Sequence, residues 1–227
     1  MALFELRKVG KTYPTRSERG VQALDAIDLS IERGSMVALC GPSGAGKSTL
    51  LSLLGLLDRP TCGELRFDGH DLATSADVAR TRARRRMAFV FQDYGLLAGL
   101  NGWENVIQAL IPRGVPRANR RDKIASWFKK LKLLPMAERA VEEWSGGERQ
   151  RLALARALAC EPEVLLADEP TSNLDEETAT VVFQALREYH ERGGTFVVAT
   201  HDRTLSDVAT CLVRLRGGRC EGIESRS

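Results

Sequence analysis

The segment Gly41-Pro-Ser-Gly-Ala-Gly-Lys-Ser-Thr49 constrains the fold of this chain more than any other part of it. It fits the pattern G-x-x-x-x-G-K-[ST], whose glycines let backbone N–H groups turn inward around phosphate oxygens. The apolar run Met36–Cys40 before it predicts a strand, and Lys47–Leu57 predicts a buried helix that begins inside the motif. The helix N-terminus attracts anions to the same place. The pattern therefore predicts a triphosphate site between a strand and a helix.

Two side chains of this loop have specific expected tasks. Lys47 supplies a point charge to the β- and γ-phosphates, and Ser48 offers a hydroxyl to Mg²⁺. The residues expected to surround the phosphates are Gly41, Pro42, Ser43, Gly44, Ala45, Gly46, Lys47, Ser48 and Thr49.

A second apolar run, Val164-Leu-Leu-Ala-Asp-Glu169, ends in two carboxylates. Apolar residues on both faces are typical of a central strand, and open α/β sheets bind ligands where their strands end. We expect Asp168 to hold the Mg²⁺ shell and Glu169 to orient or polarise the attacking water. Solvated acids at a strand end are the alternative, which the phosphate loop makes less favourable.

Two more polar residues follow apolar strand runs. Gln92 ends the run 87–91, and His201 ends the run 196–200. Both could converge on the γ-phosphate from neighbouring strands, although a lone Gln or His is more often a surface or capping residue.

A second glycine-rich segment, Ser145-Gly-Gly-Glu-Arg-Gln-Arg151, opens a predicted helix. Ser145 is a good N-cap, Glu148 completes a capping-box pattern, and the glycines expose N–H groups. An ordinary helix start would need nothing more. Because one nucleotide needs only one glycine-rich cradle, the segment raises the question of whose nucleotide it serves.

The remaining pattern predicts an α/β fold with a mainly parallel sheet and an N-terminal antiparallel β region. At 227 residues the chain is long enough for a single domain, with a core at 1–92 and 159–227. An inserted helical lobe is expected at 93–158. The lobe's predicted helices are Asn101–Ile111, Pro116–Leu133 and Gly146–Leu158.

Charge and composition exclude several classes. The net charge of +3 is too balanced to imply nucleic acid, and no apolar stretch is long enough to span a membrane. Five scattered cysteines without CxxC spacing indicate reduced thiols in a cytosolic protein. The predicted helix 76–86 is strongly basic. We expect its run Arg80–Arg86 and the basic face of 113–132 to be solvated, with contact to anionic lipid headgroups or a partner as the alternative.

Together these motifs resemble those of the nucleotide-binding subunits of ABC transporters, and the resemblance covers essentially the whole chain. Gly41–Ser48 matches the Walker A loop and Val164–Asp168 the Walker B strand. The other matches are the catalytic glutamate Glu169, the Q-loop glutamine Gln92, the switch histidine His201, the signature motif Ser145-Gly146-Gly147-Glu148 and the D-loop Ser172-Asn173-Leu174-Asp175. Tyr13 falls where the family places an aromatic residue that stacks on adenine.

The resemblance implies an ATPase that takes ATP and Mg²⁺. The implied catalytic residues are Lys47, Gln92, Glu169 and His201, and the implied metal ligands are Ser48, Gln92 and Asp168. The ATP contacts include Tyr13, the Walker A residues, the signature motif and Asp175. Phrases such as Gly55-Leu-Leu-Asp-Arg-Pro-Thr61 look like the lipoprotein-release, macrolide-export and cell-division branch. Trp144, Glu148 and Ser172 depart from the commonest residues of that branch.

In that family the signature motif caps the nucleotide on the partner's Walker A loop. The resemblance thus implies a subunit of a bacterial ABC transporter that pairs head-to-tail with a second copy around two ATP. A separate integral membrane subunit is expected to dock near Gln92–Leu100, which places the chain at the cytoplasmic face of the inner membrane. The work driven would be export, lipoprotein release or mechanotransmission.

Two other classes fit less well. Soluble ABC-type ATPases that act on DNA or chromosomes carry long coiled-coil insertions between the Walker A and signature motifs. The stretch between Lys47 and Ser145 is too short for these and has no sustained heptads, so no nucleic acid is expected. A P-loop kinase would not need Glu169 or the signature motif, and no acceptor site is evident.

Overall fold

The computed structural model describes residues 2–14, 20–172 and 174–226. Its N-terminal sheet has four strands in the order β2-β1-β4-β5. The strands are β1 (Ala2–Tyr13), β2 (Val21–Glu32), β4 (Cys62–Phe67) and β5 (His70–Asp71), and all their pairings are antiparallel. This confirms the expected N-terminal antiparallel region.

The second sheet has six strands in the order β10-β9-β3-β8-β7-β6. They are β3 (Met36–Cys40), β6 (Met87–Val90), β7 (Val164–Asp168), β8 (Thr195–Ala199), β9 (Cys211–Arg216) and β10 (Arg219–Ser225). All neighbours are parallel except the edge pair β9 and β10. The central strands β7 and β8 are buried along their whole length, as their unbroken apolar sequences predict.

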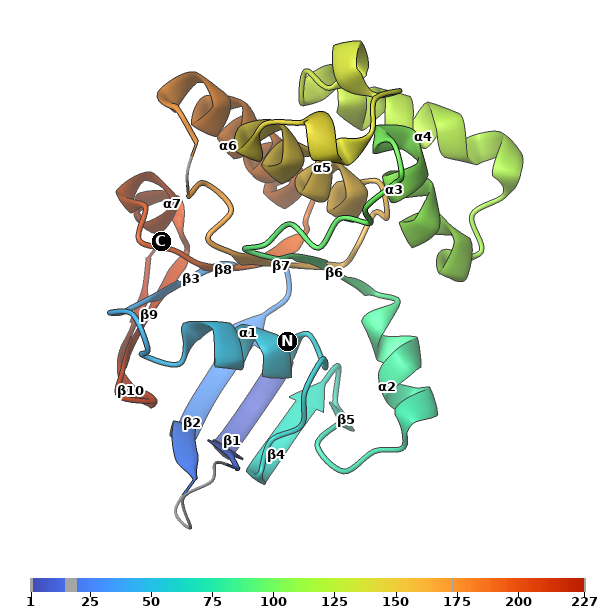
Figure 1. Cartoon of the computed structure of the whole chain (residues 1–227). Coiled ribbons are helices and arrows are strands. Elements are labelled where there is room, and N and C mark those ends of the chain that lie inside the picture. Colours follow the sequence, from blue (N-terminus) through green and yellow to red (C-terminus); the bar gives the residue numbers. More distant parts are fainter. Residues whose placement is uncertain (1, 15–19, 173, 227) are drawn as a thin grey trace.

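Helices cover both faces of the six-stranded sheet (Figure 1). The helices are α1 (Lys47–Leu54), α2 (Asp77–Arg84), α3 (Gly102–Leu110), α4 (Arg117–Lys130), α5 (Gly146–Leu158), α6 (Glu176–Glu191) and α7 (Arg203–Val208), with short 3₁₀ turns at Ile111–Arg113, Leu134–Met136 and Val141–Glu143. Helix α1 lies between the two sheets, and its leucines share one core with both (Figure 1).

On the opposite face, α3 to α6 form a helical layer over β6 to β8 (Figure 1). Its core runs without a break from Phe128 and Trp144 in this layer to Ala167 and Val198 in the sheet. Helix α5 contacts α3 and α4 as well as β6, so it joins the other helices of the layer to the sheet.

Two expectations need correction. The helix predicted over Lys47–Leu57 ends at Leu54, because Gly55 is its C-cap and Leu56 has a positive φ of 56°. The basic run Arg80–Arg86 is not a uniformly solvated face, because Arg80 is 2% exposed and donates hydrogen bonds to backbone carbonyls. A long basic side chain can be buried when its guanidinium finds several acceptors.

Candidate functional site

The carboxyl ends of the parallel strands open onto a cleft of about 800 Å³. The order β8-β7-β6 sets His201, Glu169 and Gln92 at the ends of three adjacent strands. The sequence-predicted residues that line the cleft are Tyr13, Ser43, Gly44, Ala45, Gly46, Lys47, Ser48, Thr49, Gln92, Asp168, Glu169 and His201. Side chains that lay far apart in the sequence thus meet at one place.

The loop between β3 and α1 requires glycine at two positions. Gly46 is the N-cap of α1 with a φ of 102°, and a Cβ there would lie 2.7 Å from the Ala23 carbonyl. Gly41 is packed so closely that a Cβ would lie 2.1 Å from the Leu215 carbonyl oxygen. No side chain caps α1, so its first N–H groups remain available to an anion.

Lys47 is 8% exposed and points back along the loop. Its Nζ donates to the carbonyls of Gly41 at 2.7 Å and Pro42 at 3.2 Å, and it lies 3.2 Å from His201 Nε2. The ammonium is therefore held beside the uncapped helix start, which concentrates positive potential where phosphates would bind.

Glu169 and His201 are in contact. Glu169 follows β7 with a positive φ of 50°, a conformation that costs a non-glycine residue energy and often occurs at functional sites. Its Oε2 accepts the His201 backbone N–H at 3.3 Å, and its Oε1 lies 3.4 Å from His201 Nε2. Asp168, the last residue of β7, is buried beside them.

The rim contains residues that the sequence reasoning did not single out. Thr171 donates to Asp202 Oδ2 at 2.9 Å, and Asp202 also caps α7 by accepting the Thr204 N–H at 2.8 Å. This bond ties the segment after β7 to the segment after β8. An Asp placed just before a short helix is a capping signal that could have identified Asp202.

Tyr13 also lines the cleft, together with Val21 and Ala23. It is 36% exposed, and its hydroxyl donates to Asp58 Oδ2 at 3.0 Å. Burial and the neighbouring Asp58 carboxylate raise the pKa of the Tyr13 hydroxyl, so it remains a neutral donor.

The second glycine-rich segment does not line this cleft. Ser145 caps α5: its Oγ accepts the Glu148 N–H at 3.3 Å, and Glu148 Oε2 accepts the Ser145 N–H at 2.7 Å. This is a complete capping box. Asp175 caps α6 by accepting the Thr178 N–H at 2.9 Å. Residue Asn173 of the predicted D-loop lies outside the described residues.

A glycine loop between β3 and α1, with a lysine inside it and carboxylates at the end of β7, defines a P-loop nucleoside-triphosphate-binding protein. The family model described as "ABC transporter" matches residues 24–172, and the chain belongs to that family. It is accordingly an ATP-binding ATPase of the ABC transporter class.

Several known proteins are similar over almost the whole chain. The lipoprotein-releasing system ATP-binding protein LolD of Nitratidesulfovibrio vulgaris is 44% identical over 95% of this chain and 93% of its own length. The macrolide export ATP-binding/permease protein MacB of Brucella abortus is 39% identical over 96% of this chain, which spans 34% of that longer protein. The dimeric post-hydrolysis structure of the ATP-binding cassette MJ0796 with ADP and Pi superposes with a TM-score of 0.93, at 36% identity over 99% of both chains.

These similarities confirm the predicted fold class and the ATPase class. They give no support to the alternative of an ATPase that acts on nucleic acid. Within the described ranges, no helix is both long enough and apolar enough to cross a membrane.

Proposed function

We propose that this chain is the ATP-hydrolysing subunit of a transporter, and that two copies pair head-to-tail around two ATP molecules. The position of Ser145–Glu148 carries the proposal, because this glycine-rich helix start lies outside the chain's own cleft. It would serve the γ-phosphate bound to a second copy. The similar cassette MJ0796 is described as dimeric, which supports the same arrangement.

Within each cleft the proposed roles follow from position. Lys47 and the uncapped N-terminus of α1 bind the phosphates, and Glu169 polarises the attacking water. His201 contacts both Lys47 and Glu169. Its proposed role is to keep Glu169 oriented toward the γ-phosphate that Lys47 binds. The Tyr13 ring offers a stacking surface for adenine.

The donor set also fits a magnesium ion. Ser48, Gln92 and Asp168 all line the cleft and supply a hydroxyl, an amide oxygen and a carboxylate. Mg²⁺ prefers such oxygen ligands and keeps several waters and phosphate oxygens in its shell. When bound, the ion would neutralise charge on the β- and γ-phosphates, and these three residues would hold it.

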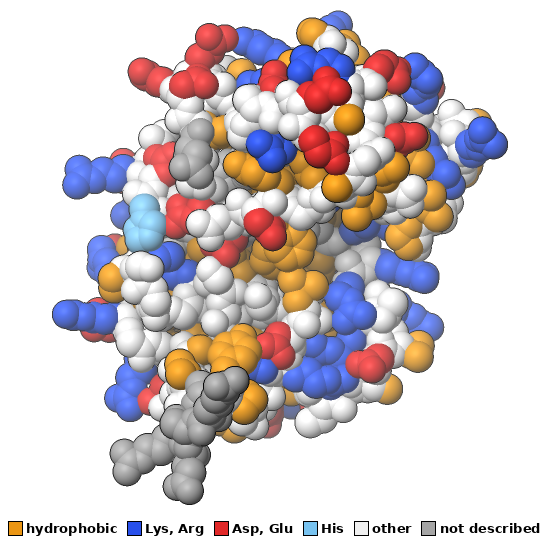
Figure 2. All heavy atoms as spheres, in the orientation of Figure 1, with side chains coloured by type: hydrophobic (Ala, Val, Ile, Leu, Met, Phe, Trp, Pro, Cys, Tyr) orange, Lys and Arg blue, Asp and Glu red, His pale blue; other side chains and the backbone are white. Residues whose placement is uncertain are grey.

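The membrane partner is proposed to dock near the segment Gln92–Leu100. This segment lies where the proposed core (1–92 and 159–227) meets the proposed helical lobe (93–158). Figure 2 shows hydrophobic side chains gathered in the hollow between the helical layer and the sheets below it. Leu97, in this segment, is 49% exposed. LolD and MacB are named for lipoprotein release and macrolide export, so a permease subunit at the cytoplasmic face of the membrane is the partner proposed here.

The variant Glu169→Gln tests the shared site. It keeps the size and one acceptor oxygen of Glu169 but removes the carboxylate that polarises water, so ATP binding should persist while turnover falls by about 100-fold or more. With saturating Mg-ATP, sedimentation should then show a trapped dimer. Glu221→Gln, on the edge strand β10, is the matched control and should behave as wild type. A Glu169→Gln chain that stays monomeric with Mg-ATP, and whose complex with the membrane subunit does not close, would contradict the proposal.

A further inference from the structure

We infer that Asp58 is a positioning residue that fixes the Tyr13 ring in the wall of the cleft, and that Arg80 holds Asp58 in place. The inference rests on the proposed stacking of Tyr13 on adenine. It concerns a part of the chain that none of the phosphate motifs includes, the turn between α1 and β4.

Asp58 holds Tyr13 directly, through its hydroxyl, and indirectly, through Lys11. Asp58 Oδ2 accepts the Tyr13 hydroxyl at 3.0 Å, and Asp58 Oδ1 accepts Lys11 Nζ at 2.7 Å. The same Nζ lies 4.8 Å from the centroid of the Tyr13 ring. The ring is thus fixed at its hydroxyl edge by the carboxylate and covered on one face by the ammonium, which leaves the other face for a base.

Asp58 belongs to a turn whose backbone is strained. Leu56, two residues before it, has a φ of 56° although it is not glycine, and its side chain is fully buried. A non-glycine residue keeps such a conformation only where its surroundings impose it. The position of the Asp58 carboxylate therefore depends on what holds this turn.

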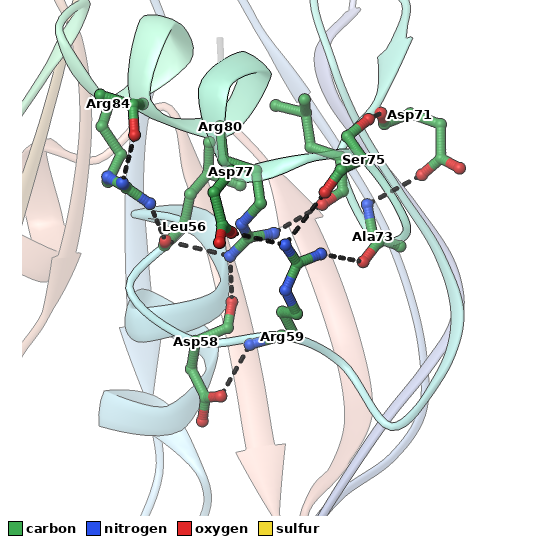
Figure 3. Close-up of polar contacts among 11 residues, drawn as sticks. Leu56, Asp58, Arg59, Asp71, Ala73, Ser75, Asp77, Arg80 and Arg84 are labelled. Atoms are coloured by element: carbon green, nitrogen blue, oxygen red, sulfur yellow. Dashed lines mark hydrogen bonds and ion pairs between the residues drawn. The ribbon is translucent and has the colours of Figure 1, made fainter.

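Arg80 of α2 binds the backbone of this turn (Figure 3). Its guanidinium donates to the carbonyl oxygens of Asp58 at 2.6 Å, Leu56 at 3.0 Å and Leu72 at 2.5 Å. Arg84 donates to the same Leu56 carbonyl at 3.1 Å. A planar guanidinium presents its N–H donors in a rigid fork, so it can hold three carbonyls at defined angles.

Arg59 ties the same turn to the segment before α2. It donates to the carbonyls of Ala73 at 3.1 Å and Ser75 at 3.0 Å, and its guanidinium pairs with Asp77 at 2.7 Å (Figure 3). The turn is consequently bound to α2 from both sides. A ring held in this way before the nucleotide arrives loses less freedom on binding, which favours affinity.

The test compares ATP with inorganic tripolyphosphate, which has the phosphates but no base. Asp58→Ala should raise the Kd and KM for ATP roughly fivefold, because it removes a charged acceptor from the Tyr13 hydroxyl. Tripolyphosphate affinity and kcat should stay within twofold of wild type. Tyr13→Phe, which removes only the hydroxyl, should reproduce this result, and the double variant should add little to either change.

Two further variants complete the series. Asp58→Asn keeps an acceptor for the Tyr13 hydroxyl and should restore most of the ATP affinity that Asp58→Ala loses. Glu64→Gln removes a surface carboxylate that pairs with Arg66 outside this network and should leave both affinities unchanged. Tyr13→Phe keeps the inference testable if Asp58→Ala fails to fold.

The outcomes separate this inference from the proposed function. If Tyr13→Ala weakens ATP but Tyr13→Phe and Asp58→Ala do not, the positioning role is overturned and the stacking role remains. If Tyr13→Ala leaves ATP affinity unchanged, the proposed stacking fails and the inference fails with it. If Asp58→Ala weakens ATP and tripolyphosphate equally, its role is general support of the fold, which also overturns the inference.

Discussion

The two glycine-rich helix starts of this molecule are built in opposite ways. The N-cap of helix α1 is Gly46, whose φ is 102° and which provides no side-chain cap. The N-cap of helix α5 is Ser145, whose φ is −62° and whose hydroxyl forms a full capping box with Glu148. The first start leaves its N–H donors to a ligand, whereas the second is already stabilised by its own side chains. A helix start that needs no ligand for its own stability can be presented to another molecule.

The glycines show the same difference. A Cβ at Gly46 would meet a backbone carbonyl at 2.7 Å, so the fold itself requires glycine there. A Cβ at Gly147 would meet Leu174 and Thr178 side chains at 3.5 and 3.6 Å, which is ordinary contact. The fold of one chain therefore does not require glycine at position 147, which agrees with the proposal that this residue faces a second copy.

The largest expected effect is on ATP turnover, which should depend on the N-terminus of α1. Lys47→Ala removes the charge beside the uncapped start of α1 and should lower ATP turnover by about 100-fold or more, since electrostatic stabilisation is a major part of phosphoryl transfer. Lys132→Ala, which removes a surface ammonium paired with Glu177, is the control and should keep wild-type turnover. A steady-state hydrolysis assay measures both. If Lys47→Ala keeps its turnover within tenfold of wild type, the glycine-rich loop Gly41–Ser48 is not part of the catalytic site.

The next largest effect compares Gly46 and Gly147 through the free energy of unfolding. Gly46→Ala should lower the free energy of unfolding by about 3 kcal/mol, because alanine is strained at a φ of 102°. Gly147→Ala should raise the free energy of unfolding by about 0.5 kcal/mol, since alanine is the better helix former. Urea unfolding without nucleotide measures both changes. Equal losses in the two variants would show that the second start is as strained as the first.

Much of this comparison was visible in the sequence. The motifs lie at the ends of apolar runs, and parallel strands bring their ends to one edge, so the meeting of Lys47, Asp168 and His201 in one cleft followed from the pattern. The capping box of Ser145 and Glu148 was local and equally readable. The first prediction depended on a general rule for parallel sheets, and the second depended on a local helix-capping rule.

The network around Asp58 was not visible in the same way. Arg80 belongs to a run of arginines with no apolar periodicity, so its sequence resembles a solvated face. Its burial depends on carbonyls of Leu56 and Asp58, which a strained turn exposes. The contact between Tyr13 and Asp58 joins the end of β1 to the turn after α1, and no periodic pattern of the sequence predicts that these distant residues meet.

A smaller effect tests the cap of α5 alone. Ser145→Ala removes the hydroxyl that accepts the Glu148 N–H and should cost about 1 kcal/mol of unfolding free energy. ATP binding to the isolated chain should not change, because Ser145 does not line its own cleft. Calorimetric titration with ATP measures this. A weaker affinity in the monomer would place the second start within its own nucleotide site.

The smallest effect concerns the other half of the capping box. Burial raises the pKa of Glu148, but hydrogen bonds from Ser145 outweigh it and hold the pKa below the ordinary value of 4.5. The stabilisation by the carboxylate is therefore fully present above pH 4.5 and is lost as the pH falls through the folded-state pKa. Glu148→Gln keeps a capping-box acceptor and should cost only a few tenths of a kcal/mol at pH 6, after solvent screening. Because glutamine does not titrate, the difference in unfolding free energy between wild type and Glu148→Gln should shrink towards pH 3. A difference that stays constant over this range would show that the cap of α5 does not depend on the Glu148 charge.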